Sequence, residues 1–417
     1  MTRFTVYVGD TLAGYLEEAT DGSTRFRFDQ AYLRLPQRPV LGQHFEDDLG
    51  KRYKGKRRGL LPAFFANLVP EGKLRRLIEH SLQIPRDDDL ALLSAVSSDL
   101  PGAVRLVPVE ELSHKQTQPT ELVSPSGLED ADSTQLLRFS LAGVQLKFSV
   151  LSSDERITLP GRDGIGRWIV KLDTLSYPGY VENEYATLEW ASAAGFEVPA
   201  CHLADRNALP ASLLQHAPSG RPVFLIKRYD RSDEDGHRIH QEDFAQVFDL
   251  YPERKYDQIT YEGIAALSRA LLGDPGYDEI VRRLVFMVAS GNLDAHLKNW
   301  SLYYPDGMRA QLAPLYDQVS IVAWVPTTDL ERSWALKFAG VKDPYRTDIQ
   351  TFVRLAKRAG ADPDRTLRVV DETLHNIVEG WHAASVSMKM PADHIDVLKT
   401  YWHCVPLLTE HAKAISG

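Results

Sequence analysis

The spacing of hydrophobic residues changes at about residue 240, and this change limits the chain to a fold with two unlike halves. Between Phe139 and Asp230, apolar residues form short runs of the length that predicts strands. These runs lie at 148–151, 168–172 and 222–226, with a helical stretch at 182–194. Beyond residue 241, apolar residues recur at helical spacing, as at 367–381, which predicts buried helix faces. A sheet-containing part should therefore precede a mainly helical part.

The first hundred residues predict a further unit, with strands followed by helices. Phe4, Val6 and Val8 alternate with polar residues, as on a half-buried strand. Residues 62–80 have a helical apolar pattern that is interrupted at 70–72. Ser, Thr, Pro, Gln and acidic residues then dominate a stretch without periodicity, which predicts a linker. The expected division is 1–110 for the N-terminal subdomain, 111–135 for the linker, 136–235 for a small lobe and 236–417 for a helical lobe.

Composition excludes several classes of protein. A net charge of −9 argues against binding nucleic acid by charge alone. Cys201 and Cys404 are the two cysteines, and their separation suggests neither a disulfide framework nor a zinc site. The N-terminus lacks the apolar core of a signal peptide, and the longest clear apolar run, 284–289, is too short to cross a bilayer. A cytoplasmic protein without membrane contact is expected.

Three polar residues, Asp294, Asn299 and Asp317, have the order and spacing of the catalytic region of protein kinases. Four residues separate the first two, and a predicted hairpin, whose second strand reaches 315–317, leads to the third. In phosphoryl transfer a carboxylate accepts the proton of the attacking hydroxyl, the role that Asp294 suits. Magnesium prefers oxygen ligands, which Asn299 and Asp317 supply. The pattern therefore predicts a magnesium–nucleotide site.

Other interpretations of the same loop stay open. Asp294 and Asn299 could belong to a polar loop that caps helix ends, and Asp317 could start a turn. His296 could be a structural hydrogen-bonding residue. A metal-dependent hydrolase is poorly supported because no second histidine lies nearby.

The segment 140–148 is a candidate phosphate loop. Its small residues Ala142 and Gly143 would let backbone N–H groups approach phosphate oxygens, although a tight turn between strands is the commoner origin of such residues when they are taken alone. Lys171 ends an apolar strand, where a kinase places the lysine that neutralises the α- and β-phosphates. Glu184, on the following predicted helix, could orient it as an ion pair. Lys171 could instead point to water.

Taken together, these segments resemble the HipA family of toxin serine/threonine kinases over nearly the whole chain. The motifs that carry the resemblance are Val6-Tyr7-Val8, residues 65–72 and 102–108, Ala142-Gly143-Val144-Gln145, residues 182–184, 228–231 and 240–244, residues 294–299, and Tyr316-Asp317. The resemblance implies an α+β, two-lobed protein-kinase-like fold with an N-terminal α/β subdomain and a mainly helical C-terminal lobe.

The resemblance also implies roles for individual residues. Asp294, Lys171 and His296 would be catalytic, and Asn299 and Asp317 would bind Mg²⁺. Ser140 would be autophosphorylated, which would displace the phosphate loop. The residues expected to contact ATP are Ala142, Gly143, Val144, Gln145, Lys147, Lys171, Lys227, Tyr229, Asp230, His296, Asn299 and Asp317, with 225–229 as the hinge between the lobes.

The implied partners are a protein substrate, such as an aminoacyl-tRNA synthetase, and a HipB-like helix-turn-helix antitoxin that would bring the kinase to operator DNA indirectly. Residues 51–58 carry six positive charges and could meet DNA phosphates, or form a solvated loop. Two other functions remain open: a kinase-like, non-catalytic corepressor subunit and a small-molecule phosphotransferase.

Overall fold

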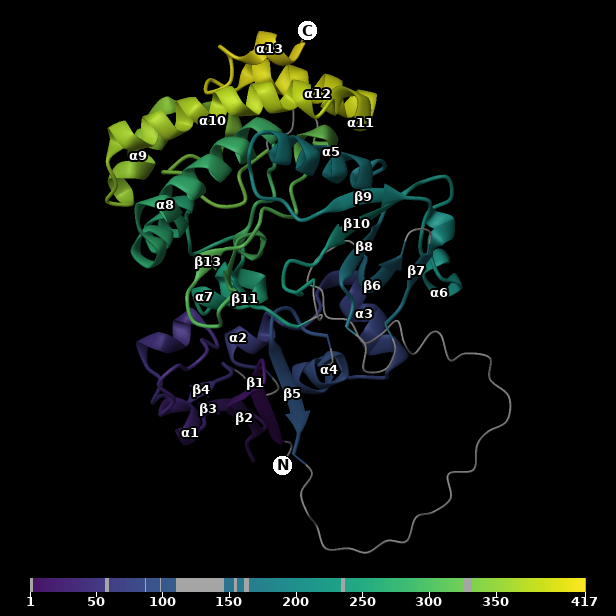
Figure 1. Cartoon of the computed structure of the whole chain (residues 1–417), viewed down its shortest axis with the longest axis vertical. Helices are drawn as coiled ribbons and strands as arrows, with labels where there is room; N and C mark the ends of the chain where they lie inside the picture. The colour runs from purple at the N-terminus through teal and green to yellow at the C-terminus, as the bar shows by residue number, and fades with distance from the viewer. Residues whose placement is uncertain are drawn as a thin grey trace, which may run out of the picture.

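The structure, a computed structural model, describes residues 3–56, 60–86, 88–97, 99–109, 146–153, 156–160, 165–233, 237–325 and 332–416. The expected linker at 111–135, Ser140 and the loop residues Ala142 to Gln145 lie outside these ranges. Figure 1 shows the N-terminal elements at one end of the molecule and the last helices at the other. No helix within the described ranges is long and apolar enough to span a bilayer.

The N-terminal subdomain is an antiparallel sheet covered by short helices. Its strands are β1 (Arg3–Val8), β2 (Thr11–Glu18), β3 (Thr24–Phe28), β4 (Tyr53–Lys54) and β5 (Val104–Pro108), in the order β4-β3-β2-β1-β5. Its helices are α1 (Gln30–Leu33), η1 (Gln43–Asp47), α2 (Ala63–Ala66), α3 (Gly72–Ser81) and α4 (Asp89–Val96). Phe4, Val6 and Val8 are buried, as their alternation predicts.

A second antiparallel sheet forms the small lobe. It contains β6 (Lys147–Ser153), β7 (Arg156–Thr158), β8 (Trp168–Leu172), β9 (Cys201–Ala204) and β10 (Val223–Lys227), in the order β7-β6-β8-β10-β9. The helical segments are α5 (Tyr180–Ala193), η3 (Arg206–Ala208) and α6 (Ala211–Leu214). Side chains of this sheet, such as Val170 and Leu225, share one hydrophobic core with Phe26 and Phe65 of the N-terminal subdomain. That common core fixes the small lobe against the N-terminal subdomain.

The remaining chain is mainly helical, as predicted. Its helical segments are α7 (Phe244–Val247), η4 (Pro252–Arg254), α8 (Tyr261–Ser290), η5 (Leu297–Asn299), η6 (Ile321–Trp324), η7 (Pro344–Arg346), α9 (Ile349–Arg358), α10 (Pro363–Ala383), α11 (Val386–Lys389), α12 (Ala392–Cys404) and α13 (Ala412–Ser416). The predicted stripe lies on α10, where Val370, Ile377 and Trp381 are buried. Helix α5 packs against α10, which ties the two lobes together (Figure 1).

A small sheet carries the chain into the region between the lobes. It consists of β11 (His240–Asp243), β12 (Ser301–Tyr304) and β13 (Gln311–Leu312). The second hairpin strand is shorter than the sequence suggests, because β13 ends at Leu312 rather than reaching Asp317. Pro314 has no N–H for a strand ladder, and the Leu315 N–H donates to the carbonyl of Glu197 instead. Asp317 therefore lies in irregular backbone, with a positive φ of 50°.

Candidate active site

A cavity of about 200 Å³ lies between the lobes and is lined by most of the described residues that the sequence pattern singles out, although Glu184 is not among them. Its walls come from the small-lobe sheet, the loop after α8, the segment after β13 and the N-terminal subdomain. The lining residues with a predicted role are Lys147, Lys171, Lys227, Tyr229, Asp230, Asp294, His296, Asn299 and Asp317. Residues separated by more than a hundred positions in the sequence thus face one space.

Lys171 joins the two lobes across this cavity. It is buried on β8, and its ammonium group is ion-paired with Glu184 of α5 and with Asp317. Lys147, opposite Lys171 in the β6–β8 register, places its Nζ 3.6 Å from Asp317 Oδ2. Burial would raise the pKa of Asp317, but the ammonium groups of Lys147 and Lys171 outweigh it and hold this pKa well below its ordinary value. Asp317 is therefore an ionised carboxylate.

Asp294 follows directly from the end of α8. The helix stops at Gly291, whose φ of +63° suits a residue without a Cβ. Asn292, which the sequence pattern did not single out, accepts from the Asp294 N–H at 3.1 Å and donates to Gln318 Oε1 at 3.2 Å. Its side chain thus links the Asp294 loop to the segment that carries Asp317. An Asn two residues before an Asp is the signal for such an Asx turn.

Burial raises the pKa of the Asp294 carboxyl, and the hydroxyl of Tyr256, which donates to Oδ1 at 2.9 Å, offsets part of that rise. Asn299 donates its side-chain N–H to the Asp294 carbonyl at 3.3 Å, which leaves its amide oxygen for a cation. A carboxylate and an amide oxygen are ligands that Mg²⁺ accepts. Among the described residues, no group of three or more His, Cys, Asp or Glu side chains forms a metal site by itself.

His296 lies in the same loop as a neutral imidazole. Burial is the main reason that its pKa falls to about 3, and the nearby Lys255 lowers it further. Its ring meets that of Tyr256 edge to face, with centroids 5.1 Å apart. Its Nδ1 is buried and has no hydrogen-bond partner among the described residues. A ligand in the cavity could satisfy this nitrogen.

The N-terminal subdomain contributes to the site, which the sequence did not reveal. Lys298 Nζ donates to both the carbonyl and the side-chain oxygen of Asn67 at 3.0 Å and to Asp243 at 2.8 Å. Lys255 Nζ lies 2.9 Å from Glu71. The Lys298 contact connects the end of α2 to the Asp294 loop, and the Lys255 contact connects the turn after α2 to the segment after η4. No local pattern could indicate the contacts with Asn67 and Glu71, because 231 and 184 positions separate these residues from Lys298 and Lys255.

The predicted hinge residues lie at the end of β10. The Lys227 side chain is paired with Asp233, and its backbone N–H donates to the Ala200 carbonyl at 2.8 Å. Tyr229 stacks on Tyr316, with ring centroids 5.6 Å apart, and its hydroxyl contacts Gln241. Their contacts with adenine stay a prediction.

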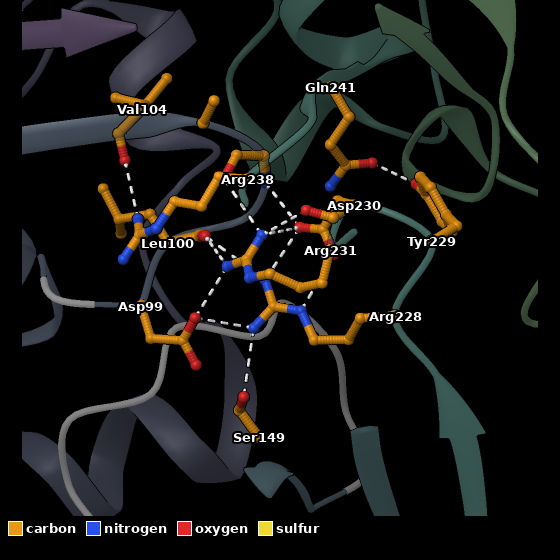
Figure 2. A network of polar contacts seen from close by, with 12 residues as sticks. Asp99, Leu100, Val104, Ser149, Arg228, Tyr229, Asp230, Arg231, Arg238 and Gln241 are labelled. Carbon is orange, nitrogen blue, oxygen red and sulfur yellow. Dashed lines mark hydrogen bonds and ion pairs between the residues drawn. The ribbon is translucent and has the colours of Figure 1, made fainter. Parts of the chain in front are cut away.

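Asp230 takes part in a buried ionic network, shown in Figure 2. Its carboxylate bonds to Arg228 and Arg231 at 2.8 Å and accepts from the Gly102 N–H at 2.7 Å. Asp99 of the N-terminal subdomain bonds to the same two guanidinium groups at 2.8 Å. The Asp230 carboxylate is therefore already satisfied within the protein. Its contact with ATP stays a prediction.

The chain is similar to known proteins over most of its length. The model of the HipA N-terminal domain matches residues 4–107, and that of the HipA-like C-terminal domain matches residues 139–381. Y4dM of Sinorhizobium fredii, which carries a provisional kinase name, is 34% identical over 95% of this chain and 96% of its own length. The serine/threonine-protein kinase toxin HipA of Shewanella oneidensis is 24% identical over 67% of each chain.

A solved structure shares the whole fold. The Shewanella oneidensis HipA chain in complex with HipB and operator DNA superimposes with a TM-score of 0.73 at 19% identity, over 98% of this chain and 96% of that one. The α+β, two-lobed kinase-like fold expected from the sequence is thereby confirmed.

Proposed function

We propose that this chain, which belongs to the HipA family, is an ATP-dependent serine/threonine protein kinase and the toxin of a toxin–antitoxin system. The observation that carries the proposal is the meeting of Lys171, Asp294, Asn299 and Asp317 in one cavity between two lobes. A kinase requires these groups together, because phosphoryl transfer depends on positioning and charge stabilisation.

Each group has a distinct part in the proposed reaction. Asp294 orients the attacking hydroxyl and accepts its proton, and burial brings its pKa closer to that task. Lys171, held by Glu184, neutralises phosphate charge. Asn299 and Asp317 would hold Mg²⁺, which neutralises the charge of the phosphates when bound. The pairing of Asp317 with Lys171 and Lys147 supports this role, since it keeps the carboxylate ionised.

The finer parts of the proposal come from the family. Ser140 would be autophosphorylated, a protein such as an aminoacyl-tRNA synthetase would be the substrate, and a HipB-like antitoxin would be the partner. The HipA of Shewanella oneidensis crystallised with HipB and operator DNA, which supports an antitoxin partner and an indirect contact with DNA here.

The two other functions are less well supported. A non-catalytic corepressor would not need Asp294 and Asp317 to line the same cavity as Lys171. A small-molecule phosphotransferase would not need an N-terminal subdomain that reaches Lys298 and Lys255.

Phosphoproteomics after brief expression tests the proposal. Wild-type protein should produce new phosphoserine or phosphothreonine peptides that are missing when Asp294→Asn is expressed to the same level. Identical phosphopeptides in both cultures would contradict the proposal. Transfer of phosphate from radiolabelled ATP to small molecules but not to protein would contradict it as well.

A further inference from the structure

The hydroxyl of Tyr256 is hydrogen-bonded to Asp294, the proposed catalytic base. Tyr256 lies between η4 and α8, and its hydroxyl donates to Asp294 Oδ1 at 2.9 Å. Burial raises the pKa of the Tyr256 phenol, and the Asp294 carboxylate raises it further, so the phenol remains a proton donor. One of the two oxygens of the carboxylate that should receive the proton of a substrate hydroxyl therefore already accepts a hydrogen bond from the protein itself.

The tyrosine is held by neighbours of the site. Its ring meets the ring of His296 edge to face, and Lys255 Nζ lies 5.5 Å from the ring centroid. Lys255 is fixed in turn by Glu71 at 2.9 Å. Tyr256 is 43% exposed, so its side chain also borders solvent.

A second cavity adjoins the ring. It has a volume of about 270 Å³, and Tyr256, Tyr251 and Pro252 are among its lining residues. Glu71 and Lys255 line both this cavity and the main one. The ring therefore has space to move into without disturbing the core.

We propose that Tyr256 is a specificity-determining residue that holds the place of the acceptor hydroxyl on Asp294 and keeps water from it. A protein substrate displaces the phenol because it makes many other contacts with the enzyme. A water molecule does not displace the phenol, because its hydrogen bond to Asp294 would only replace the one that the phenol loses. The inference rests on the proposed kinase function. It implies that bound ATP is hydrolysed slowly while no acceptor is present.

Hydrolysis of ATP without an acceptor tests the proposal. In this reaction the oxygen of water bonds to the γ-phosphorus, the bond to the ADP oxygen breaks, and Asp294 accepts the proton of water. Tyr256→Phe removes one hydroxyl and leaves a water-sized space on Asp294. Phosphate release from Mg²⁺ and ATP by the full chain should rise roughly 2- to 10-fold, the range set by one hydrogen bond. Tyr7→Phe, on β1 of the N-terminal subdomain, is the matched control and should release phosphate at the wild-type rate.

Two further measurements separate the alternatives. In the double variant Tyr256→Phe/Asp294→Asn, the increase in phosphate release should vanish. With a protein acceptor, Tyr256→Phe should lower the KM for the acceptor and leave kcat unchanged. Phosphate release that is unchanged or reduced in a folded Tyr256→Phe protein would overturn the proposal, and a fall in kcat would make Tyr256 a positioning residue for Asp294. Calorimetry that detects no binding of Mg²⁺ and ATP to wild-type protein would instead refute the kinase function itself. Melting curves establish that each variant is folded.

Discussion

The ammonium group of Lys171 is ion-paired with the carboxylate of Asp317, 146 residues further along the chain. This contact joins the small lobe to the C-terminal lobe at the centre of the candidate site. Glu184 is the second, fully buried partner of the same lysine. The charges of the site therefore also stabilise the arrangement of the lobes.

Lys171→Met should lose both activity and stability. It leaves Glu184 as an unpaired buried carboxylate, a change that costs about 3–5 kcal/mol in comparable cases. Urea denaturation should report that loss. Lys171→Met/Glu184→Gln removes the unpaired charge, so it should recover most of the free energy of unfolding but none of the kinase activity. A double variant as unstable as the single one would contradict this explanation.

Asp317→Asn should weaken the use of magnesium more than the binding of nucleotide. The substitution keeps the shape of the side chain but removes the charge that would meet the cation. Titration of Mg²⁺ at fixed ATP should show a higher Mg²⁺ requirement and a lower maximal rate. Asp306→Asn, at the exposed turn after β12, is the control and should behave as wild type. An unchanged Mg²⁺ dependence in Asp317→Asn would remove this residue from the proposed ligands.

Asp99→Asn should destabilise the attachment of the N-terminal subdomain. Asp99 shares Arg228 and Arg231 with Asp230, and all four side chains are buried (Figure 2). Loss of one carboxylate leaves excess buried positive charge, at a cost of about 3–5 kcal/mol. Asp257→Asn breaks the exposed pair with Arg254 and should cost at most about 1 kcal/mol. Equal losses in the two variants, measured by denaturation, would contradict the assigned importance of the network.

Glu242 should make the stability of the protein depend on pH. Burial raises its pKa to about 8 from 4.5, although Tyr304 and the Gln43 N–H both donate to Oε1. Between pH 4.5 and 8 the folded protein holds a proton on Glu242 that the unfolded chain releases. The free energy of unfolding should therefore fall as the pH rises through this window.

Glu242→Gln carries no such proton and isolates the effect. Its stability relative to wild type should increase from pH 5 to pH 8, by up to a few kcal/mol on the order given by linkage. Melting temperatures of the two proteins across this range provide the comparison. A constant difference at all pH values would exclude Glu242 as the titrating group.

The sequence predicted those features that follow from local spacing. The strand with Lys171, the helix with Glu184 and the loop from Asp294 to Asn299 each have a local pattern, and the structure brings them to one cavity. The end of β13 was harder to predict because Pro314 interrupts the ladder within an otherwise strand-like run. The roles of Asn67 and Glu71 at the site depend on partners far away in the sequence, which periodicity does not encode.

The mass of the intact protein after incubation with ATP and Mg²⁺ tests the central claim most directly. Wild-type protein should gain one phosphate, and Ser140→Ala should not. Asp294→Asn should gain it about 10²–10⁴ times more slowly, because the group that accepts the proton is missing. An Asp294→Asn protein that is phosphorylated as fast as wild type would contradict the proposed site.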